Sequence, residues 1–227
     1  PGQGWSLMPS SVVHAALGLT VAVGLLGAYY DRRALGVVLA VIVAPELDSV
    51  LGFVMPGAHR TVLHTMLLSV VAAGALYWDT RRSGSWLRSR WGGYGVRLAW
   101  VALFVHTFTH IALDWTHLDG INLLWPLVDQ FVALDGELYI SSEGLVQTFV
   151  DISLDPATGQ QVLDAGQSGT TRSVHVSTPV QPTKEPEGPV DRRFPIAVHG
   201  WQLYVVCLGL FTLVARRLQT PTRREEQ

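Results

Sequence analysis

Residues 98–115 have the sequence LAWVALFVHTFTHIALDW, an apolar run with no charged residue before the aspartate near its end. A helix of this length crosses a hydrocarbon core of about 30 Å. His110 and Asp114 are four residues apart, which brings both side chains to the same face of a helix. The stretch therefore predicts a membrane-spanning helix whose end carries a histidine–carboxylate pair.

The composition of the whole chain agrees with a membrane protein. Of its 227 residues, 48% are hydrophobic and only 15% are charged, whereas a soluble domain carries about 25% charged residues. We predict an all-α polytopic membrane protein with five transmembrane helices, at residues 11–30, 34–55, 62–78, 98–115 and 196–215. The single cysteine permits no internal disulfide, and the net charge of −2 gives no reason to expect nucleic acid as a partner.

A different kind of sequence separates the last two predicted helices. Residues 131–154 alternate polar and apolar side chains, which predicts two or three strands. Residues 155–195 are rich in Pro, Gly, Ser and Thr, and we expect a largely irregular loop there, with a short strand at 173–177. The expected domains are a helical membrane core over 1–128, an acidic, partly β insert over 129–195, and a final helix with a basic tail over 196–227.

The placement of arginine predicts the orientation, because cytoplasmic loops are enriched in Lys and Arg. With five crossings, three groups of arginines fall on one side: Arg32 and Arg33; Arg81, Arg82, Arg88, Arg90 and Arg97; and Arg216, Arg217, Arg223 and Arg224. The acidic insert falls on the other. We expect a prokaryotic inner-membrane protein with its N-terminus and insert outside and its C-terminus in the cytoplasm. No Lys or Arg precedes the first span, so we expect that span to be retained rather than cleaved as a signal peptide.

Titratable residues within or beside apolar spans are costly and indicate function. In this chain they gather at the predicted outer ends of the helices: His14, Glu46, Asp48, His59, His64, His110 and Asp114. Imidazole and carboxylate are ligands of Zn²⁺, Mn²⁺ and Fe²⁺, so the set predicts a divalent metal centre. Arg60 lies within this set, and an arginine beside a metal suits an anionic substrate such as phosphate.

Four other histidines are interpreted differently. His106 is expected to form a contact between helices, and His117 and His175 are expected in loops. His199 fits an interfacial residue and a metal ligand equally well.

Several of these residues form motifs that resemble a known family. Pro45-Glu46-Leu47-Asp48, then His59-Arg60-x-x-x-His64, then His110-x-x-x-Asp114 followed by Gly-Ile-Asn-Leu-Leu-Trp-Pro at 120–126 is similar to the LexA-binding, inner membrane-associated metal-dependent hydrolase family. The family has Pro-Asp-(Ile/Leu)-Asp, His-Arg-Gly-x-Thr-His-Ser and Ser-His-x-x-x-Asp elements, and an early histidine that His14 matches. This sequence departs from the pattern at Glu46, Thr61, Leu63 and Thr65. The similarity covers roughly residues 10–128.

The resemblance implies a metal-dependent hydrolase, more distantly similar to the zinc-dependent phospholipase C and P1-type nuclease group. Two or three divalent cations, with zinc favoured, are then expected to act on a phosphoester, a small molecule or a lipid of the surrounding bilayer. Asp48 or Asp114 would bridge the metals, and His14, His59, His64 and His110 would be terminal ligands. Glu46 would be a ligand or general base, and Arg60 would hold the substrate's charge.

Other functions also fit a membrane protein with buried histidines and carboxylates. A metal-ion or proton transporter uses such residues, but it needs polar side chains through the full membrane thickness. A haem protein with two histidine ligands, and an inactive scaffold that presents the insert, are further alternatives. The sequence leaves the oligomeric state open.

Overall fold

The computed structural model describes residues 10–55, 57–117, 119–142, 144–155, 158–178 and 194–219. These residues cluster into two compact units, which we call the helical unit and the insert unit. Within the described ranges, the helical unit comprises residues 10–45, 68–110 and 194–219, and the insert unit comprises residues 46–67 and 111–178. Each unit is described separately.

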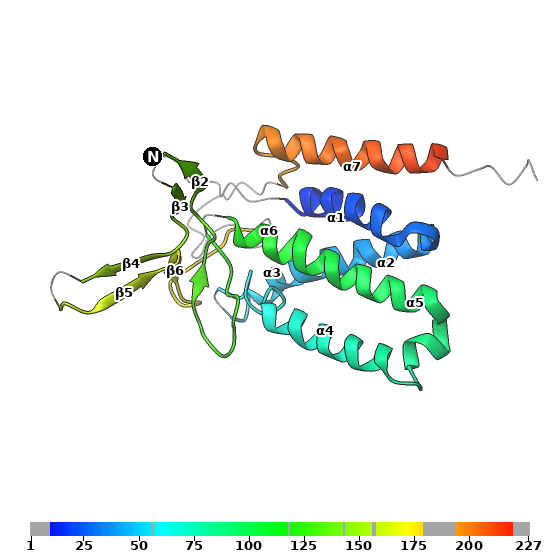
Figure 1. Ribbon diagram of the computed structural model, residues 1–227, viewed down its shortest axis with the longest axis horizontal. Helices are drawn as coiled ribbons and strands as arrows, with labels where there is room; N and C mark the ends of the chain where they lie inside the picture. The colour runs from blue at the N-terminus through cyan, green and yellow to red at the C-terminus, as the bar shows by residue number, and fades with distance from the viewer. Residues whose placement is uncertain are drawn as a thin grey trace, which may run out of the picture. The chain divides into compact units, whose positions relative to one another are not determined.

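The helical unit contains the long apolar helices (Figure 1). They are α1 (Ser11–Leu26) with the 3₁₀ turn η1 (Gly27–Tyr29), α2 (Arg32–Val43), α4 (Met66–Arg81), α5 (Trp86–Val105) with most of the π-helical turn η3 (His106–Ile111), and α7 (Gly200–Gln219). Helix α1 packs against α2, α5 and α7, and α2 also packs against α5. The side chains of Ser10 and Asp31 cap α1 and α2, because they accept from the backbone N–H groups of Val13 and Ala34.

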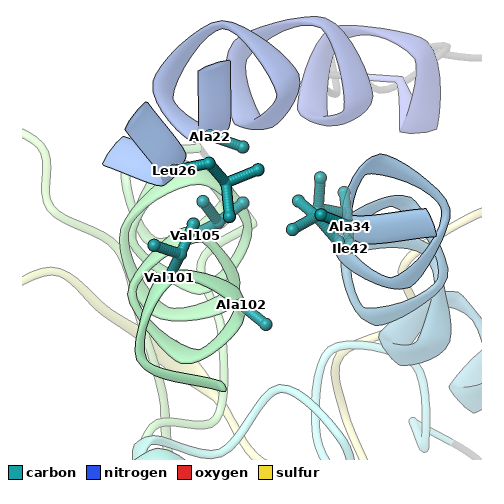
Figure 2. Close-up of a cluster of buried hydrophobic side chains, with 8 residues drawn as sticks. Ala22, Leu26, Ala34, Ile42, Val101, Ala102 and Val105 are labelled. Carbon is teal, nitrogen blue, oxygen red and sulfur yellow. The ribbon is translucent and has the colours of Figure 1, made fainter. Parts of the chain in front are cut away.

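An apolar core holds three of these helices together. Figure 2 shows Ala22 and Leu26 of α1, Ala34 and Ile42 of α2, and Val101, Ala102 and Val105 of α5 pointing toward one another. Small residues let the helix backbones approach closely, as is usual in membranes. At Gly18 of α1 an added Cβ atom would meet side chains of both α2 and α5.

Arginines gather at one end of the helical unit. Arg97 of α5 donates to the Leu25 carbonyl of α1 (2.7 Å), and Arg216 of α7 donates to the Gly27 carbonyl (3.0 Å) and lies over the Tyr30 ring. Tyr94 bonds to Asp31 in the turn between α1 and α2. His14 and His110 lie at the opposite ends of α1 and of the α5–η3 segment. The separation of arginines from histidines expected from the sequence is thus present within this unit.

The structure supports four of the five predicted spans by length and composition. Four helical segments of the described chain are long and apolar enough to cross a membrane: Ser11–Tyr29, Arg32–Leu51, Trp86–Trp115 and Gly200–Gln219. The fifth predicted span, 62–78, corresponds to α4, which begins only at Met66 and has 16 residues, or about 24 Å at 1.5 Å per residue. Gly92, with φ of 61°, breaks the regular helix within α5, in a conformation that glycine adopts readily.

The insert unit joins short helices to β-hairpins. It includes most of the 3₁₀ turn η2 (Ala44–Leu47), α3 (Asp48–Leu51) and α6 (Ala112–Trp115). Its strands are β1 (Phe131–Val132), β2 (Leu138–Ser141), β3 (Gly144–Gln147), β4 (Asp151–Leu154), β5 (Gln161–Asp164) and β6 (Gln167–Gly169). They form three antiparallel pairs, β1–β6, β2–β3 and β4–β5.

The expected strand pattern of the insert was partly wrong. Residues 131–154 contain four strands instead of two or three. The segment expected to be irregular contributes β5 and β6, because their residues pair with strands β4 and β1 that precede them in the chain. No strand forms at 173–177, where the chain has turns and extended residues. Most of the predicted loop after residue 178 lies outside the described residues.

We predict that Gly18→Leu destabilises the protein while Gly24→Leu in the same helix does not. A Cβ at Gly18 lies 2.8 Å from Val105 Cγ1 and 2.9 Å from Thr109 Oγ1 and also meets Ile42, whereas one at Gly24 meets nothing within 4 Å. Overpacking of this kind costs about 1–3 kcal/mol, or roughly 5 °C in melting temperature. Thermal unfolding in detergent measures both variants, and equal melting temperatures would contradict the packing described for Gly18.

Candidate metal centre

Two buried histidines stack at one end of the helical unit. His14 of α1 is 1% exposed and His110 of η3 is fully buried, and their ring centroids are 4.2 Å apart. His14 Nδ1 lies 2.9 Å from the Thr109 carbonyl oxygen. Because a carbonyl only accepts, Nδ1 donates the hydrogen, and a neutral His14 then has its lone pair on Nε2. Metal-binding histidines are commonly oriented by such a bond from the other ring nitrogen.

The helix carrying His110 is locally distorted. Residues His106–Ile111 form a π-helical turn, and such turns occur frequently at functional sites. The regular helix α6 follows and carries Asp114, one turn after His110. His14, His110 and Asp114 are all buried, and each offers an atom of a kind that binds metal ions.

A second chain of contacts lies within the insert unit and also includes Asp114. His64 Nδ1 donates to Asp48 Oδ2 at 2.9 Å, and His64 Nε2 lies 3.3 Å from Asp114 Oδ2. Both oxygens of Asp48 also accept from the Leu63 backbone N–H, at 2.9 and 3.0 Å. Asp48 thus lies behind His64 and orients its ring through Nδ1.

The two carboxylates determine the charge of His64. Burial alone would lower the pKa of His64, but the hydrogen bonds to Asp114 and Asp48 outweigh it and raise the pKa to about 9. A proton therefore lies between His64 Nε2 and Asp114 at neutral pH when no cation competes for that position. Two ligands of one tetrahedral zinc ion, with bonds of about 2.0–2.1 Å, lie roughly 3.3 Å apart, so the observed separation suits a shared cation.

Arg60 has a different position from the one expected for a substrate-binding residue. Its guanidinium is 2% exposed and donates from Nη2 to Asp114 Oδ1 at 2.9 Å and from Nη1 to His117 Nδ1 at 3.1 Å. The Arg60 backbone has φ of 60°, a left-handed conformation that is uncommon for a residue with a side chain. The guanidinium is inaccessible to a substrate in this arrangement and instead fixes one oxygen of Asp114.

His59 combines burial with a nitrogen that has no hydrogen bond. Its ring packs edge-on against His64, with centroids 5.5 Å apart. Among the described residues, its buried Nδ1 atom finds no hydrogen-bond partner, although buried polar atoms are almost always paired. Burial, followed by the charges of His64 and Arg60, lowers the pKa of His59 well below its usual value, so the imidazole is neutral and has a free lone pair.

The remaining predicted residues divide between the two units. Glu46 is half-buried in η2, two residues before Asp48, and its backbone carbonyl accepts from the Ser49 hydroxyl. His106 is buried in η3, with its ring 6.5 Å from that of His110. His199 is exposed just before α7 and is not part of either buried group.

Sequence reasoning missed two residues that support Arg60. His117 was expected in a loop, but it is buried and accepts a hydrogen bond from Arg60. The sequence does contain a signal for this contact, because His117 follows Asp114 by three residues and therefore lies on the same side of a helical turn. Asn122 is fully buried and donates its backbone N–H to the Arg60 carbonyl at 2.9 Å; no spacing in the sequence indicates this contact.

A family model described as YdjM inner membrane protein matches residues 8–173, and the chain belongs to this family. All eight predicted site residues lie within the matched range. Among curated proteins and among solved structures, no significant match is found. Family membership and the four apolar helices confirm the predicted inner-membrane location.

We predict that Asp48→Ala strongly destabilises the protein. The substitution leaves a buried cationic His64 and the Leu63 N–H without their carboxylate, and removing one partner of a buried charged pair costs about 3–5 kcal/mol, or roughly 10 °C. Asp135→Ala is the control, because Asp135 is exposed. If the two variants melt together in detergent, the Asp48–His64 contact is not important for the fold.

Proposed function

We propose that this inner membrane protein is a metal-dependent hydrolase acting on a phosphoester at the extracytoplasmic face. The observation that carries the proposal is the position of Asp114. This buried carboxylate of the insert unit is held by Arg60 through one oxygen, and its second oxygen lies 3.3 Å from His64 Nε2. Imidazole and carboxylate in this combination favour zinc, with Mn²⁺ or Fe²⁺ as alternatives.

The surrounding residues support a site that is oriented before a cation binds. The Thr109 carbonyl fixes the His14 ring, and Asp48 fixes the His64 ring through Nδ1. Arg60 holds Asp114 by its other oxygen. These three contacts are of the kind that orient metal ligands from behind and increase their affinity for the ion. His59, with its free buried nitrogen, is an additional ligand candidate.

A bound divalent cation supplies Lewis acidity, which polarises a phosphoryl oxygen and makes water a stronger acid. Glu46 is the nearest acidic residue in sequence to Asp48 and is only half-buried, so it is our candidate for accepting a proton from water. The histidines of the helical unit lie at the ends of apolar helices, which corresponds to the depth of lipid headgroups in the proposed orientation. This location favours a lipid phosphoester over a soluble one.

The apolar interior of the helical unit argues against the transport alternative. Midway along α1, α2 and α5 the buried cluster consists of alanine, valine, leucine and isoleucine. An ion crossing the membrane needs polar partners along its path. This cluster supplies none.

The metal is tested first. We expect protein purified without chelator to contain stoichiometric transition metal by mass spectrometry, and His110→Ala and Asp114→Ala each to lower that content at least about tenfold, as lost site residues commonly do. His199→Ala is the matched control, because that histidine is exposed in the same unit as His110. A wild-type protein without metal would refute the proposal.

The role of Arg60 gives a separate prediction. Arg60→Gly removes the guanidinium while suiting the left-handed backbone, so we expect it to lower metal occupancy by releasing Asp114. The same samples are assayed for hydrolysis of a phospholipid and a generic phosphodiester. Unchanged metal content with lost turnover would restore Arg60 as a substrate-binding residue. Metal flux into sealed vesicles, without hydrolysis on a broad ester panel, would favour a transporter.

The proposed orientation is tested by cysteine labelling. In a Cys207→Ser background we expect Val54→Cys and Ser168→Cys to react with an impermeant reagent from outside, and Ser83→Cys only after permeabilisation. All three positions are exposed. The arginines between α4 and α5 support this orientation and require that α4 cross the membrane despite its length. Labelling of Val54→Cys and Ser83→Cys from the same side would show that it does not.

A further inference from the structure

The turn between α4 and α5 forms a surface that neither the fold nor the proposed hydrolysis explains. Four arginines are exposed here, Arg81, Arg82, Arg88 and Arg90. Exposed aromatic residues lie among them: Tyr77, Trp78, Trp86 and Trp91 are 47–66% exposed. All of them belong to the helical unit, at its arginine-rich end.

Three of the guanidinium groups lie over aromatic rings. Arg82 lies 4.4 Å above the Trp78 ring and Arg81 lies 5.1 Å above the Tyr77 ring. Arg90 makes the same kind of contact with Trp91 at 5.7 Å. A guanidinium over an aromatic ring is attracted to the ring face, and its N–H groups can still donate to phosphate oxygens.

A pocket of about 530 Å³ opens beside these side chains. It is lined mainly by apolar groups, with one cation at its edge: Ala75, Leu76, Trp78, Asp79, Arg82, Trp86 and Leu87. Asp79 is the single carboxylate of the lining, and it is engaged in capping α5 through the backbone N–H groups of Trp86 and Leu87. Asp79 also accepts from Arg82 Nη2, which leaves that guanidinium other N–H groups to donate.

We propose that this pocket binds one anionic phospholipid molecule, with acyl carbons against Ala75, Leu76 and Leu87 and the phosphate at Arg82. An apolar wall with a cationic rim is complementary to an amphiphile that carries a phosphodiester. The chain is an inner membrane protein, so this partner is present around it. Tryptophans at this end match the interfacial depth at which a lipid phosphate lies. The site is distinct from the His–Asp groups and does not depend on hydrolysis.

The proposal is tested by native mass spectrometry of protein mixed with equal amounts of phosphatidylglycerol and phosphatidylcholine. We expect wild type to retain phosphatidylglycerol preferentially and Arg82→Gln to bind it about fivefold more weakly, the effect of one arginine near an anionic lipid. Ala75→Phe fills the pocket at an exposed position without changing any charge, and we expect the same loss from it.

Arg32→Gln is the matched control. Arg32 is exposed at the start of α2 in the helical unit, but it does not line the pocket. An equal loss in Arg32→Gln would show that diffuse charge, and not the pocket, attracts the lipid. Full binding by Ala75→Phe, or no preference for phosphatidylglycerol in wild type, would also overturn the proposal.

Discussion

The buried ion pair between Arg60 and Asp114 is the interaction on which the insert unit's polar site depends. Removing two charges from water is expensive, and it is tolerated only where each charge has partners. Arg60 has three, the Asp114 carboxylate, the His117 ring and the Gly120 carbonyl. With one oxygen of Asp114 held in this way, the other is directed to His64, whose second nitrogen is held by Asp48.

This chain of contacts includes an unfavourable backbone conformation, which the contacts maintain. Arg60 adopts φ of 60°, which costs a residue with a side chain about 1–3 kcal/mol. The conformation is maintained from both ends, by the side-chain contacts and by the Asn122 N–H bonded to the Arg60 carbonyl. Asn122 in turn donates to Asp129, which accepts from the Thr171 backbone and hydroxyl. The strand-rich part of the insert therefore restrains the loop that carries the histidines.

The sequence predicts the parts of this protein that follow from local rules. Apolar runs predicted the membrane helices, and a spacing of four placed His110 and Asp114 one turn apart. The positions of the arginines predicted that they lie at the end of the helical unit opposite the histidines. The burial of Arg60 was not predictable, because it depends on Asp114, His117 and Gly120, which lie 54 or more residues away in the chain. Strands β5 and β6 were missed for the same reason: each is stabilised by a partner strand, not by its own alternation of residues.

The separation of polar groups along the helices restricts what the protein can do chemically. In the helical unit, stacked imidazoles lie at one end, arginines at the other, and an uncharged core lies between them. A proton or ion that enters at the histidine end meets no further ligand in that core. Chemistry at the histidine end is therefore separate from the charge at the arginine end. This separation supports the proposed reaction on one side of the membrane over passage through it.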